Sequence, residues 1–196
     1  MKTRSLVHPM KTCSLVRPMK TRSLVLTAMF TALTAVGAWI RIPIPVCPFT
    51  LQLLFTMLAG ILLGGRLGAL SVLCYIGLGL AGLPVFADGG GIAYVFQPTF
   101  GYLIGFALGS LVTGEIAEHG KLPLMKRLLA ADFAGLAVVY GCGMAYYWVI
   151  MTYYVGTGIG LWTLFLYCFL LAVPGDIVLC VLAAVIGTRV RPVVFR

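Results

Sequence analysis

Residues 51–83 read LQLLFTMLAGILLGGRLGALSVLCYIGLGLAGL, and this stretch decides the fold class. Arg66 is its only charged residue. A single helix of this length would measure about 50 Å, whereas the hydrocarbon core of a bilayer is about 30 Å thick. Gly64 and Gly65, directly before Arg66, offer a place to turn, so we predict two short membrane helices here.

The composition of the whole chain supports a membrane protein. Apolar residues make up 61% of the 196 positions and charged residues only 10%, and the mean hydropathy is +1.07. Soluble domains are about half apolar and about a quarter charged. A protein of 21.0 kDa could not bury this excess in its own core, so the lipid bilayer is the expected solvent.

Four more apolar runs complete the pattern. They cover residues 24–40, about 99–117, about 128–153, and a last run that starts between 161 and 171 and ends near Gly187. We therefore predict an all-α integral membrane protein with six transmembrane helices. The expected organisation is a basic N-terminal tail at 1–22, a membrane domain at 23–190, and a C-terminal tail at 191–196.

The basic residues indicate the orientation. With the N-terminus inside, 13 of the 14 lysines and arginines lie in inner segments, and only Arg41 lies outside. Positive residues favour the cytoplasmic side of membrane proteins. We expect a multi-pass protein of the cytoplasmic membrane, with both termini in the cytoplasm.

The N-terminal tail contains a repeat of nine residues that begins at Met1, Met10 and Met19. Each copy is too short to form a repeat fold. We interpret it as a triplicated start region, in which Met19 could begin a complete protein. A basic amphipathic anchor is the alternative, whereas a cleaved signal peptide is not expected.

Several function classes lack their motifs. The net charge of +9 comes from residues in the tail and at the ends of apolar runs, without interleaved aromatic residues, so nucleic acid is not an expected partner. No phosphate-binding loop of the G-x-x-x-x-G-K-[ST] type is present. The six cysteines form no CxxC pair, and no metal or cofactor is expected. Ser71 and Ser110 have no evident base, so an enzyme is not expected either.

The outer loops differ from simple connections. Residues 41–50 contain three prolines, and residues 84–98 contain Gly89, Gly90 and Gly91, followed by Tyr94 and Gln97. Glycines let a backbone approach a ligand, and aromatic rings offer flat apolar contact. These loops could close over a small molecule, or they could be tight turns between helices.

Two aspartates fall within apolar runs. Asp176 follows Pro174 and Gly175, where a helix must bend or begin. Its carboxylate could accept hydrogen bonds from a ligand, or it could cap the helix N-terminus. Asp132 is explained by neutralisation through nearby Lys126 or Arg127.

Small residues recur at a spacing of four. Ala28 and Ala32 share a face of the first run, and two rows of glycines have the same spacing of four residues. The alanine pair could contact a partner or pack internally, and we expect the glycine rows to pack internally. The rows are Gly60, Gly64, Gly68 and Gly101, Gly105, Gly109.

Five blocks of the sequence closely resemble the BioY family, in order, over about residues 22–190. They are Ile42-Pro-Ile-Pro-Val-Cys-Pro-Phe-Thr-Leu-Gln52, Leu58-Ala-Gly-Ile-Leu-Leu-Gly-Gly-Arg-Leu-Gly-Ala69, Gly79-Leu-Ala-Gly-Leu-Pro-Val-Phe86, Gln97-Pro-Thr-Phe-Gly-Tyr-Leu-Ile-Gly-Phe106 and Pro174-Gly-Asp176, together with the glycine triplet. BioY proteins are the biotin-binding S components of energy-coupling factor (ECF) transporters.

The resemblance implies a six-helix S-component bundle that holds biotin near its outer face. It also implies a transmembrane coupling (T) protein, which would dock on Ala28 and Ala32, and a pair of ABC-type ATPases. The implied biotin contacts, with Tyr94 and Arg41 added from the outer-loop argument, are Gly89, Gly90, Gly91, Tyr94, Gln97, Tyr102, Asp176 and Arg41.

One position departs from the family pattern. Many members have a lysine three residues after the aspartate of the Pro-Gly-Asp motif, and here that residue is Leu179. The backbone N–H groups around the glycine triplet, together with Arg41, could receive the biotin carboxylate. Alternatively, the tail of biotin ends in water. An S component for another vitamin, a lipid-acting intramembrane enzyme and a structural subunit are the remaining alternatives.

Overall fold

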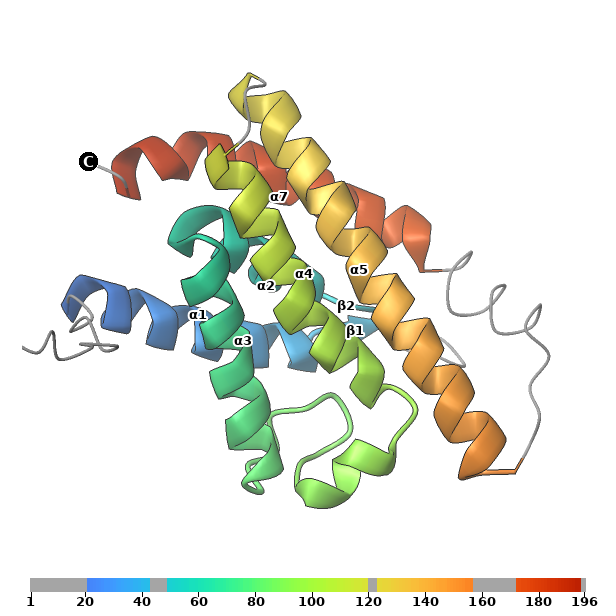
Figure 1. The fold of residues 1–196 in the computed structure, drawn as a ribbon. Helices are drawn as coiled ribbons and strands as arrows, with labels where there is room; N and C mark the ends of the chain where they lie inside the picture. The colour runs from blue at the N-terminus through green and yellow to red at the C-terminus, as the bar shows by residue number, and fades with distance from the viewer. Residues whose placement is uncertain (1–20, 43–48, 120–122, 157–171, 195–196) are drawn as a thin grey trace, which may run out of the picture.

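The computed structural model describes residues 21–42, 49–119, 123–156 and 172–194. These ranges contain six α-helices, labelled as in Figure 1. They are α1 (Thr21–Trp39), α2 (Gln52–Leu63), α3 (Gly65–Leu80), α4 (Phe100–His119), α5 (Leu124–Tyr153) and α7 (Val173–Val194). The N-terminal repeat lies outside the described residues apart from its last few positions.

Four of the helices, α1, α4, α5 and α7, are long and apolar enough to cross a membrane. The other two are shorter, with 12 residues in α2 and 16 in α3. They come from the stretch 51–83, which therefore forms two short helices as predicted. The prediction of a helical membrane protein with six helices is confirmed.

The break between α2 and α3 occurs at Gly64. Its φ angle is 85°, in the left-handed region that glycine adopts without steric cost. A Cβ atom here would also overlap the carboxyl group of Glu118 on α4. Both the backbone angle and the packing therefore require glycine at the turn.

The central helix of the bundle is α2, which contacts α1, α3, α4, α5 and α7. Ten of its 12 residues are buried. A helix surrounded on all sides needs apolar residues all round rather than on one stripe. This explains why the sequence of α2 shows no polar face. In Figure 1, α4 runs between α3 and α5.

Glycines bring α4 and α5 close together. A Cβ at Gly105 would lie 2.9 Å from the carbonyl oxygen of Val139, and one at Gly109 would lie 3.0 Å from that of Gly135. The contact between α2 and α4 is equally close, because a Cβ at Gly60 would lie 2.5 Å from the carbonyl oxygen of Ser110. Both glycine rows therefore pack inside the bundle, as expected.

The last helix differs from its predicted bounds. The described helix begins at Val173 and continues to Val194, beyond the predicted end near Gly187. Gly187 does not end the helix, because its missing side chain makes room for Ile61 and Leu128, 2.9 and 3.2 Å from the position of a Cβ. Residues 161–171, where the start was expected, lie outside the described residues.

Asp132 is not neutralised in the expected way. Its side chain is fully buried, and neither carboxylate oxygen has a hydrogen-bond partner among the described residues. Lys126 and Arg127, the expected partners, therefore do not hydrogen-bond to it. They lie six and five residues before it on α5, whereas residues that share a helix face are three or four apart.

Short elements outside the helices position the candidate site. β1 (Arg41–Ile42) and β2 (Phe49–Thr50) pair in antiparallel register, with Arg41 opposite Thr50. The 3-10 helix η1 (Ile92–Phe96) lies in the connection between α3 and α4. In Figure 1, η1 lies at the end of the bundle where α4 begins, and β1 and β2 are drawn nearer its middle.

Candidate functional site

A cavity lies among α2, α4, α5, α7 and the connection between α3 and α4. Its empty volume is about 700 Å³, including the solvent at its open side. Most lining residues are apolar or aromatic, with a few polar groups among them, which is typical of small-molecule sites. The lining residues are Thr50, Gln52, Leu53, Ala87, Asp88, Tyr94, Thr99, Tyr102, Leu103, Phe106, Val139, Tyr140, Ala172 and Asp176.

The cavity contains a carboxyl–phenol pair. Asp176 lies in the first turn of α7, and its Oδ2 atom accepts a hydrogen bond from the hydroxyl group of Tyr140 on α5. A carboxylate in the first turn also interacts favourably with the helix dipole. The helix that begins at Val173 therefore presents Asp176 to the cavity, and Tyr140 fixes the direction of its carboxyl group.

Three tyrosines line the cavity. Tyr102 on α4 lies edge-on to the ring of Tyr140, with 6.2 Å between the ring centres. Tyr94, in η1, packs on Phe86 with 4.5 Å between the centres. Phe86 is almost completely buried and also contacts Tyr75 on α3. Buried rings thus anchor the α3–α4 connection, and the predicted residues Tyr94, Tyr102 and Asp176 share one cavity.

The glycine triplet has a structural role in this connection. Gly91 donates its N–H to the carbonyl oxygen of Gly79 at 2.8 Å, and Gly89 donates to that of Phe86 at 3.3 Å. A Cβ at Gly90 would overlap the carbonyl group of Leu83. None of the three lines the cavity. The N–H groups of Gly89 and Gly91, which were expected to receive a carboxylate, donate to these carbonyl oxygens within the protein.

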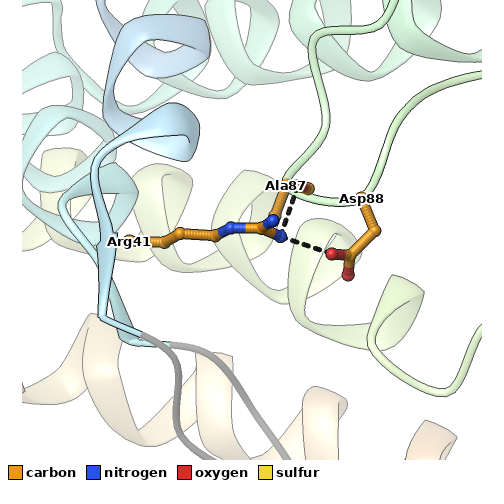
Figure 2. A network of polar contacts seen from close by, with 3 residues as sticks. All are labelled: Arg41, Ala87 and Asp88. Atoms are coloured by element: carbon orange, nitrogen blue, oxygen red, sulfur yellow. Dashed lines mark hydrogen bonds and ion pairs between the residues drawn. The ribbon is translucent and has the colours of Figure 1, made fainter.

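Arg41 connects the two loops at the mouth of the cavity, as Figure 2 shows. From β1, its Nη1 atom donates to the carbonyl oxygen of Ala87 at 2.6 Å and forms an ion pair with the carboxylate of Asp88. Ala87 and Asp88 line the cavity, whereas Arg41 does not. Its positive charge therefore already has a carboxylate partner.

Gln97 lies outside the cavity lining. Its main chain joins η1 to α4, donating to the carbonyl oxygen of Tyr94 and accepting from the N–H of Phe100, both at 3.0 Å. The amide that lines the cavity belongs to Gln52, at the start of α2. Gln52 is 3% exposed, and its side-chain amide lies beside the hydroxyl group of Tyr75 on α3.

Sequence reasoning missed five polar residues of the cavity, Thr50, Gln52, Asp88, Thr99 and Tyr140. The sequence contains a feature that could have identified Gln52 as a site residue, because it is the only amide in the apolar stretch 51–83. Tyr140 has no such feature, since tyrosine is common in membrane helices. Leu179, at the position of the family's lysine, is buried in the core and does not line the cavity.

Metal chemistry has no support in the described part of the chain. No group of three or more histidine, cysteine, aspartate or glutamate side chains gathers there in a way that could hold an ion. The arrangement is suited to non-covalent binding, with an apolar chamber and hydrogen-bonding groups on α2, α5 and α7.

Known proteins with related sequences are biotin transporters by name. A probable biotin transporter BioY of Lysinibacillus sphaericus is 47% identical over 169 residues, covering 86% of this chain and 86% of its own length. A biotin transporter BioY of Rhizobium etli is 39% identical and covers 85% of this chain and 91% of its own length.

The fold has a counterpart among solved structures. The crystal structure of the S component for biotin from an ECF-type ABC transporter matches with a TM-score of 0.74 and 27% sequence identity. The match covers 91% of this chain and 95% of that protein. The family model of the BioY family matches residues 9–196. The chain belongs to the BioY family.

Proposed function

We propose that this chain is the biotin-binding S component of an ECF-type transporter and takes up biotin across the cytoplasmic membrane. The cavity is the observation that carries the proposal. It combines aromatic walls with a carboxyl–phenol pair and a buried amide, and the chain belongs to a family whose members are named biotin transporters. The chain would act as a substrate-binding subunit and not as an enzyme.

The chemistry of biotin fits the polar groups of the cavity. Biotin is a fused ureido–thiophane ring with an aliphatic tail that ends in a carboxylate. The ureido group has two N–H donors and one carbonyl acceptor. Asp176 would accept an N–H of the ureido group, and the Nε2 group of Gln52 would donate to its carbonyl oxygen. The rings of Tyr94 and Tyr102 would cover the thiophane ring.

Energy for transport would come from partner proteins. The chain contains no phosphate-binding loop of the type that ATPases use. A pair of ABC-type ATPases and a T protein would supply ATP hydrolysis and couple it to the movement of the bound biotin. The positive-inside distribution of basic residues would place both termini on the cytoplasmic side, where the ATPases act.

A groove between α1 and α3 is suited to the T protein. Ala28 and Ala32 are exposed on α1 and line this groove together with Cys74 and Leu78 of α3. Nearly all of its lining is apolar, and the small side chains would let a partner helix approach closely. The groove lies outside the ligand cavity, so docking and ligand binding use separate surfaces.

Uptake of labelled biotin tests the proposal. The chain would be produced with a T protein and two ATPases in bacteria that lack their own biotin uptake. We expect uptake that depends on all partners. Ala32→Leu should reduce uptake at least about tenfold by filling the groove, without changing biotin binding by the purified chain.

Val36→Leu is the matched control, because Val36 is exposed on α1 and does not line the groove. Its uptake should equal that of the unchanged chain. Equal uptake by the Ala32→Leu variant would contradict docking at this groove. Absence of uptake with all partners present, in cells that contain the assembled complex, would contradict the transport function.

A further inference from the structure

The charges around the cavity are unusual for the site of an anion. Its lining residues include the carboxyl groups of Asp88 and Asp176 and no lysine, arginine or histidine among the described residues. Among the described residues, Arg41 is a basic side chain that contacts the cavity lining, through Ala87 and Asp88.

Arg41 is already engaged by the protein. One of its guanidinium nitrogens contacts both the Ala87 carbonyl oxygen and the Asp88 carboxylate (Figure 2). The side chains of Arg41 and Asp88 are each 45% exposed. A ligand carboxylate that approached Arg41 would also approach Asp88, whose negative charge cancels most of the attraction. Water solvates a carboxylate better than this neutral pair does.

The backbone N–H groups of the glycine triplet do not form an alternative binding site for a ligand carboxylate. Two N–H groups of the glycine triplet already donate to carbonyl oxygens, Gly89 to Phe86 in the same connection and Gly91 to Gly79 at the end of α3. A cradle for an anion needs several N–H groups that point at the same place without acceptors. The glycines instead serve the tight packing of the connection against α3.

The hydrogen-bonding groups that are suited to a neutral ligand lie elsewhere in the cavity. Gln52 presents a buried amide group beside the hydroxyl group of Tyr75, and the hydroxyl of Thr99 is buried without a hydrogen-bond partner among the described residues. With the Tyr140–Asp176 pair, these groups supply both donors and acceptors. This combination matches a ureido group and not a carboxylate.

We propose, on the basis of the proposed function, that the cavity recognises the bicyclic ureido head and leaves the end of the aliphatic tail in water. The head lies against Gln52, Thr99 and Asp176, and the tail leaves past Asp88 at the mouth. The ligand class is then wider than biotin itself. It includes biotin esters and biotin amides, in which the tail carries no charge.

Competition against labelled biotin tests this inference on the purified full-length chain. Unlabelled biotin, biotin methyl ester and biotinamide are the competing ligands. We expect the dissociation constants of the ester and the amide to lie within about threefold of that of biotin. Values more than about tenfold weaker for both neutral ligands would overturn the inference.

Diaminobiotin, which lacks the ureido carbonyl, is the control for the head. It should bind at least about tenfold more weakly than biotin, because its head no longer offers an acceptor to Gln52. Equal binding of diaminobiotin would overturn recognition through the ureido head. Failure of biotin itself to bind to folded protein would instead refute the proposed function.

An Arg41→Gln variant distinguishes an attraction between Arg41 and the biotin carboxylate from the role of Arg41 in connecting the two loops. If the tail ends in water, the variant changes the affinities for biotin and for its methyl ester by the same factor, whatever that factor is. The ratio of the two dissociation constants is therefore the quantity to measure. A loss of affinity for biotin alone would assign the carboxylate to Arg41 and overturn the inference.

Discussion

At the scale of single residues, the contact between Tyr140 and Asp176 determines the character of the cavity. The hydroxyl group donates to the carboxyl group across the space between α5 and α7. This leaves the other carboxyl oxygen available for a ligand and restricts the rotation of the side chain. Tyr140 is thus a positioning residue, and Asp176 is the proposed ligand contact.

Tyr140→Phe tests this role. The variant keeps the ring and loses the hydroxyl, so we expect biotin affinity to fall at least about tenfold, as for the loss of one hydrogen bond to a charged group. Titration calorimetry measures the change. Tyr147→Phe is the control, because Tyr147 is buried on the same helix but does not line the cavity.

The control should bind biotin with an affinity within about twofold of the unchanged chain. An equal loss in both variants would mean that α5 tolerates no change of this kind, and the positioning role would be wrong. Full affinity in the Tyr140→Phe variant would also contradict it.

At the scale of the helices, small residues decide how closely the elements pack. Gly114 on α4 lies so close to the start of α3 that a Cβ would overlap the backbone of Gly65. Gly141 on α5 has nothing within 4 Å of its Cβ position. The two glycines have the same helix propensity and opposite surroundings.

Gly114→Ala should therefore destabilise the protein, and Gly141→Ala should not. Overpacking a tight contact costs about 1–3 kcal/mol, whereas alanine at a free helical position gains up to about 1 kcal/mol. Thermal unfolding in detergent compares the two variants. Similar melting temperatures would contradict the contact between α4 and α3.

The helices were also the part of the fold that the sequence predicts best. Long apolar runs show where a helix must lie, and the stretch 51–83 could be divided at Gly64 because no single helix of that length fits a bilayer. The helix α7 continues beyond Gly187, the predicted end of the apolar run, because Gly187 makes room for Ile61 and does not end the helix. This role of Gly187 depends on a neighbour 126 residues away in the sequence.

At the scale of the whole molecule, the cavity combines residues that no local pattern connects. Gln52, Asp88, Thr99, Tyr140 and Asp176 come from three helices and one connection. Asp176 was predictable because a carboxylate in an apolar run is costly unless it has a function. Gln97 and Gln52 could not be distinguished, since their places depend on how η1 and α2 pack.

The role of Arg41 also depends on a contact between distant parts of the sequence. As the one basic residue of the outer segments it was a reasonable partner for a ligand carboxylate. Its ion pair with Asp88 is a tertiary contact across 47 residues of sequence. In the structure, the guanidinium group of Arg41 connects two loops at the mouth of the cavity through Ala87 and Asp88.

The central claim is that this cavity binds biotin through Asp176. Titration calorimetry of biotin into the purified chain, beside an Asp176→Asn variant of equal thermal stability, tests it most directly. The account predicts saturable binding at one site, weakened at least about tenfold in the variant, because asparagine cannot offer a charged acceptor to the ureido N–H. No binding to the folded chain, or equal affinity in both proteins, would contradict it.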